Sequence, residues 1–137
     1  MLDTNVLAAA FRSRNGASFI ILQKVAARQI KLLVTTALLL EYEAVLKRPE
    51  QIAAHGLPLS RIDDAIREFA ALSEPIDLHY QWRPQLSDPK DELVMEAAIN
   101  GRADALVTYN VRDFQHAAGR FGIRLLRPSE FLEQLKP

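Results

Sequence analysis

The chain has 137 residues, of which 49% are hydrophobic and 25% charged, as in a single globular domain rather than a disordered chain. It contains no cysteine, which excludes disulfides, thiolate zinc sites and a cysteine nucleophile. Its 17 Lys and Arg balance 17 Asp and Glu, so no overall positive charge steers nucleic acid, although 12 of the cations are Arg, the better phosphate ligand. It shows neither a membrane-length apolar run nor the pattern of a signal peptide. We therefore expect a cytoplasmic protein with no membrane partner.

Short apolar runs alternate with longer segments of helical period, which predicts one α/β domain over residues 1–137 with a mostly parallel sheet. Helices are expected at 5–12, 18–28, 36–47, 60–72, 90–101 and 129–135. Strands are expected at 32–35, 105–109 and 123–126, with a stub at 1–3 and an extended segment at 75–82. A first strand of three residues is short, so either this strand is stunted or the native start lies upstream of Met1.

Several residues are expected to mark the helix boundaries. Ser60 with Asp63 resembles a capping box, and Asp88 before Pro89 predicts an N-cap followed by proline at the first helical position. Gly101 is expected to end the helix before the strand at 105–109. The segment 48–59 contains two prolines and a glycine, which predicts a break between helices.

Acidic, amide and hydroxyl side chains fall in four separate segments of the expected strand ends and helices. They are Asp3, Thr4 and Asn5 after the first strand, Glu41 in the helix after 32–35, Asp91 in the first turn of helix 90–101, and Asn110 and Asp113 after 105–109. Because ligands bind outside the carboxyl ends of the strands in open α/β sheets, we expect these segments to meet there. Clustered carboxylates need a neutralising cation, and hard oxygen ligands favour Mg²⁺ or Mn²⁺. Such ions activate water and stabilise a leaving oxygen, which indicates phosphodiester hydrolysis.

At these residues the sequence resembles the PIN-domain family, specifically the small prokaryotic PIN proteins that are toxins of toxin–antitoxin pairs. The opening motif is Leu2-Asp3-Thr4-Asn5-Val6-Leu7, the second acidic residue matches Glu41 before Tyr42, the third matches Asp91, and the strand and loop motif runs over 103–114. The resemblance covers nearly the whole chain. Each motif is weakly specific alone, but together their order and spacing are specific.

The resemblance implies a three-layer α/β/α sandwich and a metal-dependent endoribonuclease that cuts single-stranded or looped RNA. It implies one or two Mg²⁺ or Mn²⁺ ions held by Asp3, Glu41 and Asp91, with Asn110 or Asp113 as the fourth ligand. Many relatives have Asp where this chain has Asn110, and others have Asn there with an acidic residue three positions on. The resemblance also implies a small antitoxin partner and a homodimer, for which helices 18–28 and 36–47 are the candidate faces.

Each candidate residue also has a purely structural interpretation. Asp3 and Asn5 can cap a helix, and Asp91 can complement a helix dipole. Glu41 lies in an apolar helix, where a carboxylate needs a partner, so we favour a functional role for it.

The other candidates are open in the same way. Thr108 either directs its hydroxyl to the site or reflects strand propensity alone. Glu92 is expected on the surface, and Glu96 is open between the surface and the site. Arg12, Arg14 and Arg112 follow the two motif strands, where they can hold RNA phosphates or be simply solvated.

Two other functional classes compete with a nuclease. A catalytically weak PIN module that binds RNA or protein would explain Asn110 and the zero net charge. A phosphatase or receiver-like domain shares the acidic sheet edge, but it needs an Asp-x-Asp pair at the first strand, where this chain has Asn5. We rank this third alternative last.

Overall fold

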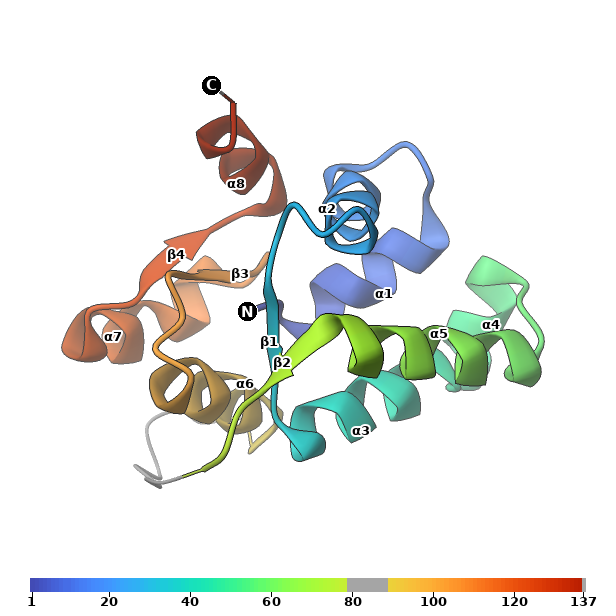
Figure 1. The fold of residues 1–137 in the computed structure, drawn as a ribbon, viewed down its shortest axis with the longest axis horizontal. Helices are drawn as coiled ribbons and strands as arrows, with labels where there is room; N and C mark the ends of the chain where they lie inside the picture. Colours follow the sequence, from blue (N-terminus) through green and yellow to red (C-terminus); the bar gives the residue numbers. More distant parts are fainter. Residues whose placement is uncertain (79–88, 137) are drawn as a thin grey trace.

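The computed structural model describes residues 1–78 and 89–136, which form an α/β fold of the α/β/α type (Figure 1). The helices are α1 (Thr4–Arg12), α2 (Ala17–Ala26), α3 (Thr36–Leu46), α4 (Pro49–His55), α5 (Leu59–Leu72), α6 (Pro89–Asn100), α7 (Val111–Phe121) and α8 (Pro128–Gln134). The strands are β1 (Leu32–Val34), β2 (Ser73–Pro75), β3 (Ala105–Val107) and β4 (Arg124–Leu126). None of the described helices is long and apolar enough to cross a membrane.

Every strand pair in the described part of the chain is parallel, as the alternation of elements predicts. β1 pairs with β2, and β3 pairs with β4. The expected first strand is reduced to a single parallel bridge between Leu2 and Val107. The Asp3 amide donates to the Val107 carbonyl and the Val107 amide donates to the Met1 carbonyl, both at 2.9 Å. The chain therefore leaves the sheet at Asp3, beside the carboxyl end of β3.

One hydrophobic core joins the helices to the strands and fixes the strand ends. Leu7 of α1, Leu38 and Tyr42 of α3, Leu106 of β3 and Phe114 of α7 are all fully buried within it. A fully buried side chain of this kind stabilises the fold by about 1.5–3 kcal/mol. Polar residues that immediately follow these anchored segments are consequently held in defined positions.

The expected break at 48–59 contains a helix, α4, so this prediction is wrong in part. Pro49 is the first residue of α4, where a missing amide hydrogen costs nothing. Gly56 follows at φ +69°, a left-handed conformation that glycine adopts without strain and that commonly ends a helix. The proline and the glycine therefore start and stop a helix here.

Helix α7 was not expected from the sequence. Its buried residues Phe114, Ala117 and Ala118 lie three and four positions apart, which places them on one helical face against the core. Gly122, at φ +69°, ends the helix. This apolar spacing was present in the sequence but was obscured by the charged and polar residues between.

The remaining helix boundaries differ by at most two residues from those expected. The helix expected at 60–72 begins at Leu59, and its N-cap residue Pro58 makes no side-chain cap, so the proposed Ser60 and Asp63 capping box is wrong. α6 begins at Pro89 and ends just before Gly101, as expected. In the extended segment 75–82, Pro75 ends β2 and the Ile76 amide donates to the Val34 carbonyl at 2.8 Å. Residues 79–82 and Asp88 lie outside the described residues.

Candidate active site

A cleft of about 200 Å³ lies beyond the carboxyl ends of the strands, and we call it the carboxylate cleft. Its described lining residues are Asp3, Thr4, Asn5, Glu41, Val45, Arg48, Asp91 and Asn110. They come from the start of α1, the middle of α3, the residue before α4, the first turn of α6 and the residue before α7. The structure thus brings together three predicted acidic residues and Asn110 from segments far apart in the sequence.

Asp3 lies at the start of α1 but does not cap it. It occupies the N-cap position and its side chain makes no capping hydrogen bond. Instead, its Oδ2 accepts a hydrogen bond of 2.7 Å from the buried hydroxyl of Thr108. The Thr108 Oγ1 in turn accepts a hydrogen bond of 2.9 Å from the backbone amide of Asn110. Thr108 therefore connects the two strand ends that deliver Asp3 and Asn110 to the cleft.

Glu41 reaches the carboxylate cleft from the middle of α3. Its side chain is only 17% exposed, and its Oε1 is buried without a hydrogen-bond partner among the described residues. Among the described residues, the cation within ion-pair distance is Arg48, whose Nη2 lies 3.8 Å from this oxygen, beyond hydrogen-bonding distance. A buried carboxylate oxygen of this kind is costly unless a ligand or ion satisfies it.

The Tyr42 hydroxyl fastens α3 to the segment that carries Asp3. The side chain is completely buried, and its hydroxyl donates to the Leu2 carbonyl at 2.5 Å. Burial, followed by the negative charge of Asp3, raises the pKa of Tyr42 above its ordinary range. The phenol therefore stays protonated and remains a donor. Because Tyr42 follows Glu41 directly, this contact fixes α3 beside Asp3.

The other acidic residues near these motifs have different environments. Asp91 lies in the first turn of α6, is partly buried and lines the cleft. Asp113 is exposed in the first turn of α7 and is not among the described lining residues. Glu92 is 6% exposed and Glu96 is 4% exposed, so the expectation that Glu92 is a surface charge is wrong. Both are buried on α6. Glu96 lies within the apolar run 93–99, which was a sign of its burial, whereas Glu92 directly follows Lys90 and Asp91 and had no such sign.

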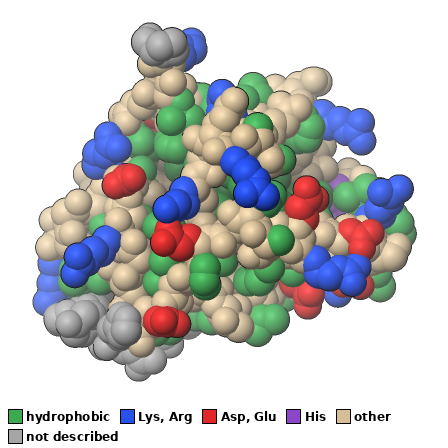
Figure 2. All heavy atoms as spheres, in the orientation of Figure 1, with side chains coloured by type: hydrophobic (Ala, Val, Ile, Leu, Met, Phe, Trp, Pro, Cys, Tyr) green, Lys and Arg blue, Asp and Glu red, His purple; other side chains and the backbone are tan. Residues whose placement is uncertain are grey.

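Arg48 is the charged cleft residue that sequence reasoning missed. It lies seven positions after Glu41, and Val45, four positions after Glu41, also lines the cleft. Glu41 and Val45 lie one turn apart on α3, but Arg48 lies beyond the end of this helix, so no periodic pattern in the sequence marked it. The predicted RNA-binding residues Arg12, Arg14 and Arg112 are not among the described lining residues. In the view of Figure 2, Lys and Arg side chains are interspersed with Asp and Glu.

The cleft has the donor chemistry of a hard-cation site without a finished ligand set. Among the residues that the structure describes, no three His, Asp or Glu side chains are grouped so as to hold a metal ion as they stand. The lining nevertheless offers carboxylate and amide oxygens, which Mg²⁺ and Mn²⁺ prefer, and Glu41 Oε1 is one that lacks a hydrogen-bond partner. Asp3, Asp91 and Asn110 also lie at or near helix N-termini, whose positive ends favour negative groups.

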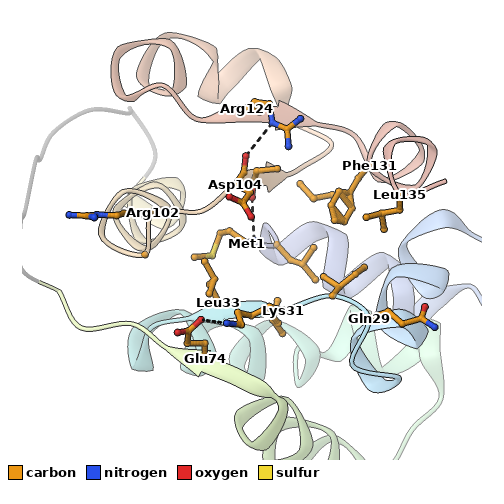
Figure 3. A pocket seen from close by; sticks show the side chains of 16 residues that line it. Met1, Gln29, Lys31, Leu33, Glu74, Arg102, Asp104, Arg124, Phe131 and Leu135 are labelled. Atoms are coloured by element: carbon orange, nitrogen blue, oxygen red, sulfur yellow. Dashed lines mark hydrogen bonds and ion pairs between the residues drawn. The ribbon is translucent and has the colours of Figure 1, made fainter. Parts of the chain in front are cut away.

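A larger cavity of about 400 Å³, which we call the amino-end cavity, lies beside the opposite ends of the strands. It is bordered by the starts of β1, β3 and β4 and by Phe131 and Leu135 near the C-terminus (Figure 3). Two of its rim cations have local partners. Lys31 Nζ lies 3.3 Å from Glu74 Oε2, and the Arg124 Nε donates to the Asp104 carbonyl at 3.3 Å. This cavity gathers no acidic cluster among the described residues that line it.

Comparison with known proteins gives one finding. A family model described as a PIN domain matches residues 1–112, which include all the described residues that line the carboxylate cleft. No significant match was found among curated proteins or among solved structures.

Proposed function

This chain belongs to the PIN-domain family, and from that premise we propose that it is a metal-dependent endoribonuclease. PIN domains are generally nucleases and generally use divalent metal ions, so the family supports a nuclease-type function. The finer proposal is hydrolysis of phosphodiester bonds in single-stranded or looped RNA, by the toxin of a toxin–antitoxin pair.

The observation that carries this proposal is the composition of the carboxylate cleft. Asp3, Glu41 and Asp91 arrive from three separate segments and line one small hollow at the carboxyl ends of the strands. Like charges gathered in this way repel one another unless a cation lies among them. The buried Glu41 Oε1 without a hydrogen-bond partner is the further sign that a positive ligand belongs here.

The cleft residues have distinct proposed roles. Asp3, Glu41 and Asp91 would hold one or two Mg²⁺ or Mn²⁺ ions, with Asn110 or Asp113 completing the set. Bound in this way, the ions supply the Lewis acidity that activates water and offsets negative charge at the scissile phosphate.

Supporting residues hold this ligand set in place. The Thr108 hydroxyl holds the Asp3 carboxylate in one orientation, as partners of metal ligands commonly do. Thr4 and Asn5, in the first turn of α1, line the cleft beside Asp3 and complete its supporting wall.

The proposed protein partner is a small antitoxin, because PIN domains commonly bind RNA and act with antitoxins. A basic antitoxin side chain that reaches Asp3 or Asp91 would replace the charge of the metal and block the cleft.

We also propose a homodimer through α2 and α3. Each of these helices exposes a large hydrophobic residue, Ile20 at 39% and Leu40 at 59%. Light scattering that gives a monomer at micromolar concentration would contradict the dimer.

The test is cleavage of a panel of mixed-sequence single-stranded RNAs in Mg²⁺, Mn²⁺ or EDTA. Asp91→Asn protein from the same purification scheme is run alongside. We expect cleavage that requires metal and disappears in the variant, because an amide at this position keeps the shape of the side chain but not its charge. Equal cleavage by both proteins would indicate a contaminating nuclease and would count against the proposal.

A second candidate function is a catalytically weak PIN module that binds RNA or protein. Two observations favour it: residue 110, at the cleft, is an uncharged Asn, and the described carboxylates do not form a finished metal cluster. Mn²⁺ affinity separates the two functions. A folded protein that neither cuts RNA nor binds Mn²⁺ would support the binding module.

A further inference from the structure

The carboxylate cleft contains a cation that the proposed metal chemistry does not use. Arg48 lines the cleft, and its side chain is 39% exposed, so it faces both Glu41 and solvent. The guanidinium lies 3.8 Å from Glu41 Oε1, which makes it a counter-ion rather than a close hydrogen-bond partner. Long, partly exposed ion pairs of this kind are weak, so the side chain is able to change partners.

The backbone at Arg48 is held more firmly than its side chain. The Arg48 amide donates to the Val45 carbonyl at 3.1 Å, and its carbonyl accepts from the Gln51 and Ile52 amides at 3.0 and 2.9 Å. Arg48 is thus fixed at the junction between α3 and α4. A fixed backbone with a weakly held guanidinium presents the side chain at the cleft whichever partner it binds.

The neighbouring cation, Lys47, is committed elsewhere. Its Nζ lies 2.6 Å from Asp63 Oδ1 on α5 and 3.8 Å from Glu43 Oε2, and it does not line the cleft. Its hydrogen bond to Asp63 raises the pKa of Lys47. Two adjacent cations therefore point to different tasks: Lys47 ties α3 to α5, whereas Arg48 borders the acidic residues.

We infer that Arg48 binds a phosphate of the RNA substrate. Its guanidinium would leave Glu41 for that phosphate when a divalent cation binds Glu41. Without a divalent cation, the guanidinium is the counter-ion of Glu41. When Glu41 coordinates a divalent cation, the Arg48 guanidinium becomes available to an RNA backbone phosphate. Its planar set of N–H donors matches the geometry of phosphate oxygens. This inference rests on the proposed ribonuclease function and adds a substrate-positioning residue to it.

The first experiment compares Arg48→Gln with Lys47→Gln, a matched loss of one cation from the adjacent position. Binding of a fluorescein-labelled, mixed-sequence single-stranded RNA is followed by anisotropy in Ca²⁺ over a series of KCl concentrations. Arg48→Gln should weaken binding about tenfold and reduce the slope of log affinity against log salt by about 0.7. Lys47→Gln should stay within about twofold of wild type. Arg48→Lys should recover the slope but only part of the affinity.

The second experiment tests the exchange between partners with a double-mutant cycle in EDTA. Glu41→Gln should strengthen RNA binding because it frees Arg48, and this gain should disappear when Arg48→Gln is added. Asp91→Asn removes a carboxylate from the same cleft and serves as the control, because its effect should not depend on Arg48. An equal gain from Glu41→Gln with and without Arg48 would overturn the exchange.

Metal binding separates a role in substrate binding from support of the cleft. We expect Arg48→Gln to bind Mn²⁺ at least as tightly as wild type in electron paramagnetic resonance titrations, because a competitor of the metal has been removed. Weaker Mn²⁺ binding would assign Arg48 to the structure of the cleft and overturn the inference. If the wild type cuts RNA but Arg48→Gln leaves the slope of log RNA affinity against log salt unchanged, this inference alone is overturned. Wild type that neither binds nor cuts RNA would overturn the proposed function with it.

Discussion

The carboxylate cleft and the amino-end cavity lie at opposite ends of the same parallel strands. The amino-end cavity is the larger, about 400 Å³ against about 200 Å³. Its rim cation Lys31 is paired with Glu74, whereas the smaller cleft contains three carboxylates and one weakly held arginine. Carboxyl ends of parallel strands collect loops and helix N-termini, and these supply functional groups. Converging chemistry, rather than volume, therefore identifies the candidate site here.

Among changes that distinguish the carboxylate cleft from the amino-end cavity, Asp3→Asn is expected to have the largest effect on RNA cleavage. The amide retains an oxygen that can accept from Thr108 but removes the charge that a metal needs. We expect RNA cleavage in Mn²⁺ to fall by at least about 100-fold, because metal ions supply several kcal/mol of transition-state stabilisation. Initial cleavage rates and Mn²⁺ titrations measure it. An unchanged rate in a pure preparation would remove Asp3 from the proposed site.

A smaller effect is expected from Thr108→Val, which keeps the side-chain shape and removes the hydroxyl. Without this hydroxyl, the hydrogen bond to Asp3 and the one from the Asn110 backbone amide are lost. Metal affinity or activity should then fall by about 10- to 100-fold. The buried groups left behind should also lower the free energy of unfolding by about 1–3 kcal/mol. Thr36→Val, at an exposed position in α3, is the control. Equal activity in both variants would show that Thr108 does not position Asp3.

Tyr42→Phe tests how α3 is fastened beside Asp3. At neutral pH, loss of the hydrogen bond to the Leu2 carbonyl should reduce the free energy of unfolding by about 1 kcal/mol. Because the pKa of Tyr42 is raised on folding, the unfolded chain releases this proton first, near pH 10. The stability that the neutral phenol contributes is thus complete below that pH and declines above it.

Urea unfolding of wild type and Tyr42→Phe between pH 9 and about pH 11 measures this difference. The decline attributable to Tyr42 approaches about 1.4 kcal/mol per pH unit above pH 10. The difference in stability between the two proteins should therefore narrow as the pH rises and vanish between about pH 10 and pH 11. Parallel curves would mean that the phenol is not held neutral in the fold.

Local and strand-end patterns in the sequence were sufficient for the parallel α/β class and for the meeting of Asp3, Glu41 and Asp91 at one cleft. They failed where an outcome depends on distant contacts. Arg48 reaches the cleft only because α3 ends at Leu46 and α4 begins at Pro49, a junction that was expected to be irregular. The contact between Tyr42 and Leu2 joins residues 40 positions apart and has no local signature. The burial of Glu92 is likewise set by packing around α6.

The smallest effect is expected from Glu74→Gln, at the rim of the amino-end cavity. Glu74 is half exposed and its ion pair with Lys31 is open to solvent, so the free energy of unfolding should change by less than about 0.5 kcal/mol. RNA cleavage and Mn²⁺ affinity should stay within about twofold of wild type. The variant removes one negative charge, as Asp3→Asn does, but at the opposite end of the strands. If cleavage fell comparably in both variants, total charge would govern activity and the carboxylate cleft would lose its special status. A loss confined to Asp3→Asn would place the chemistry at the carboxyl ends of the strands.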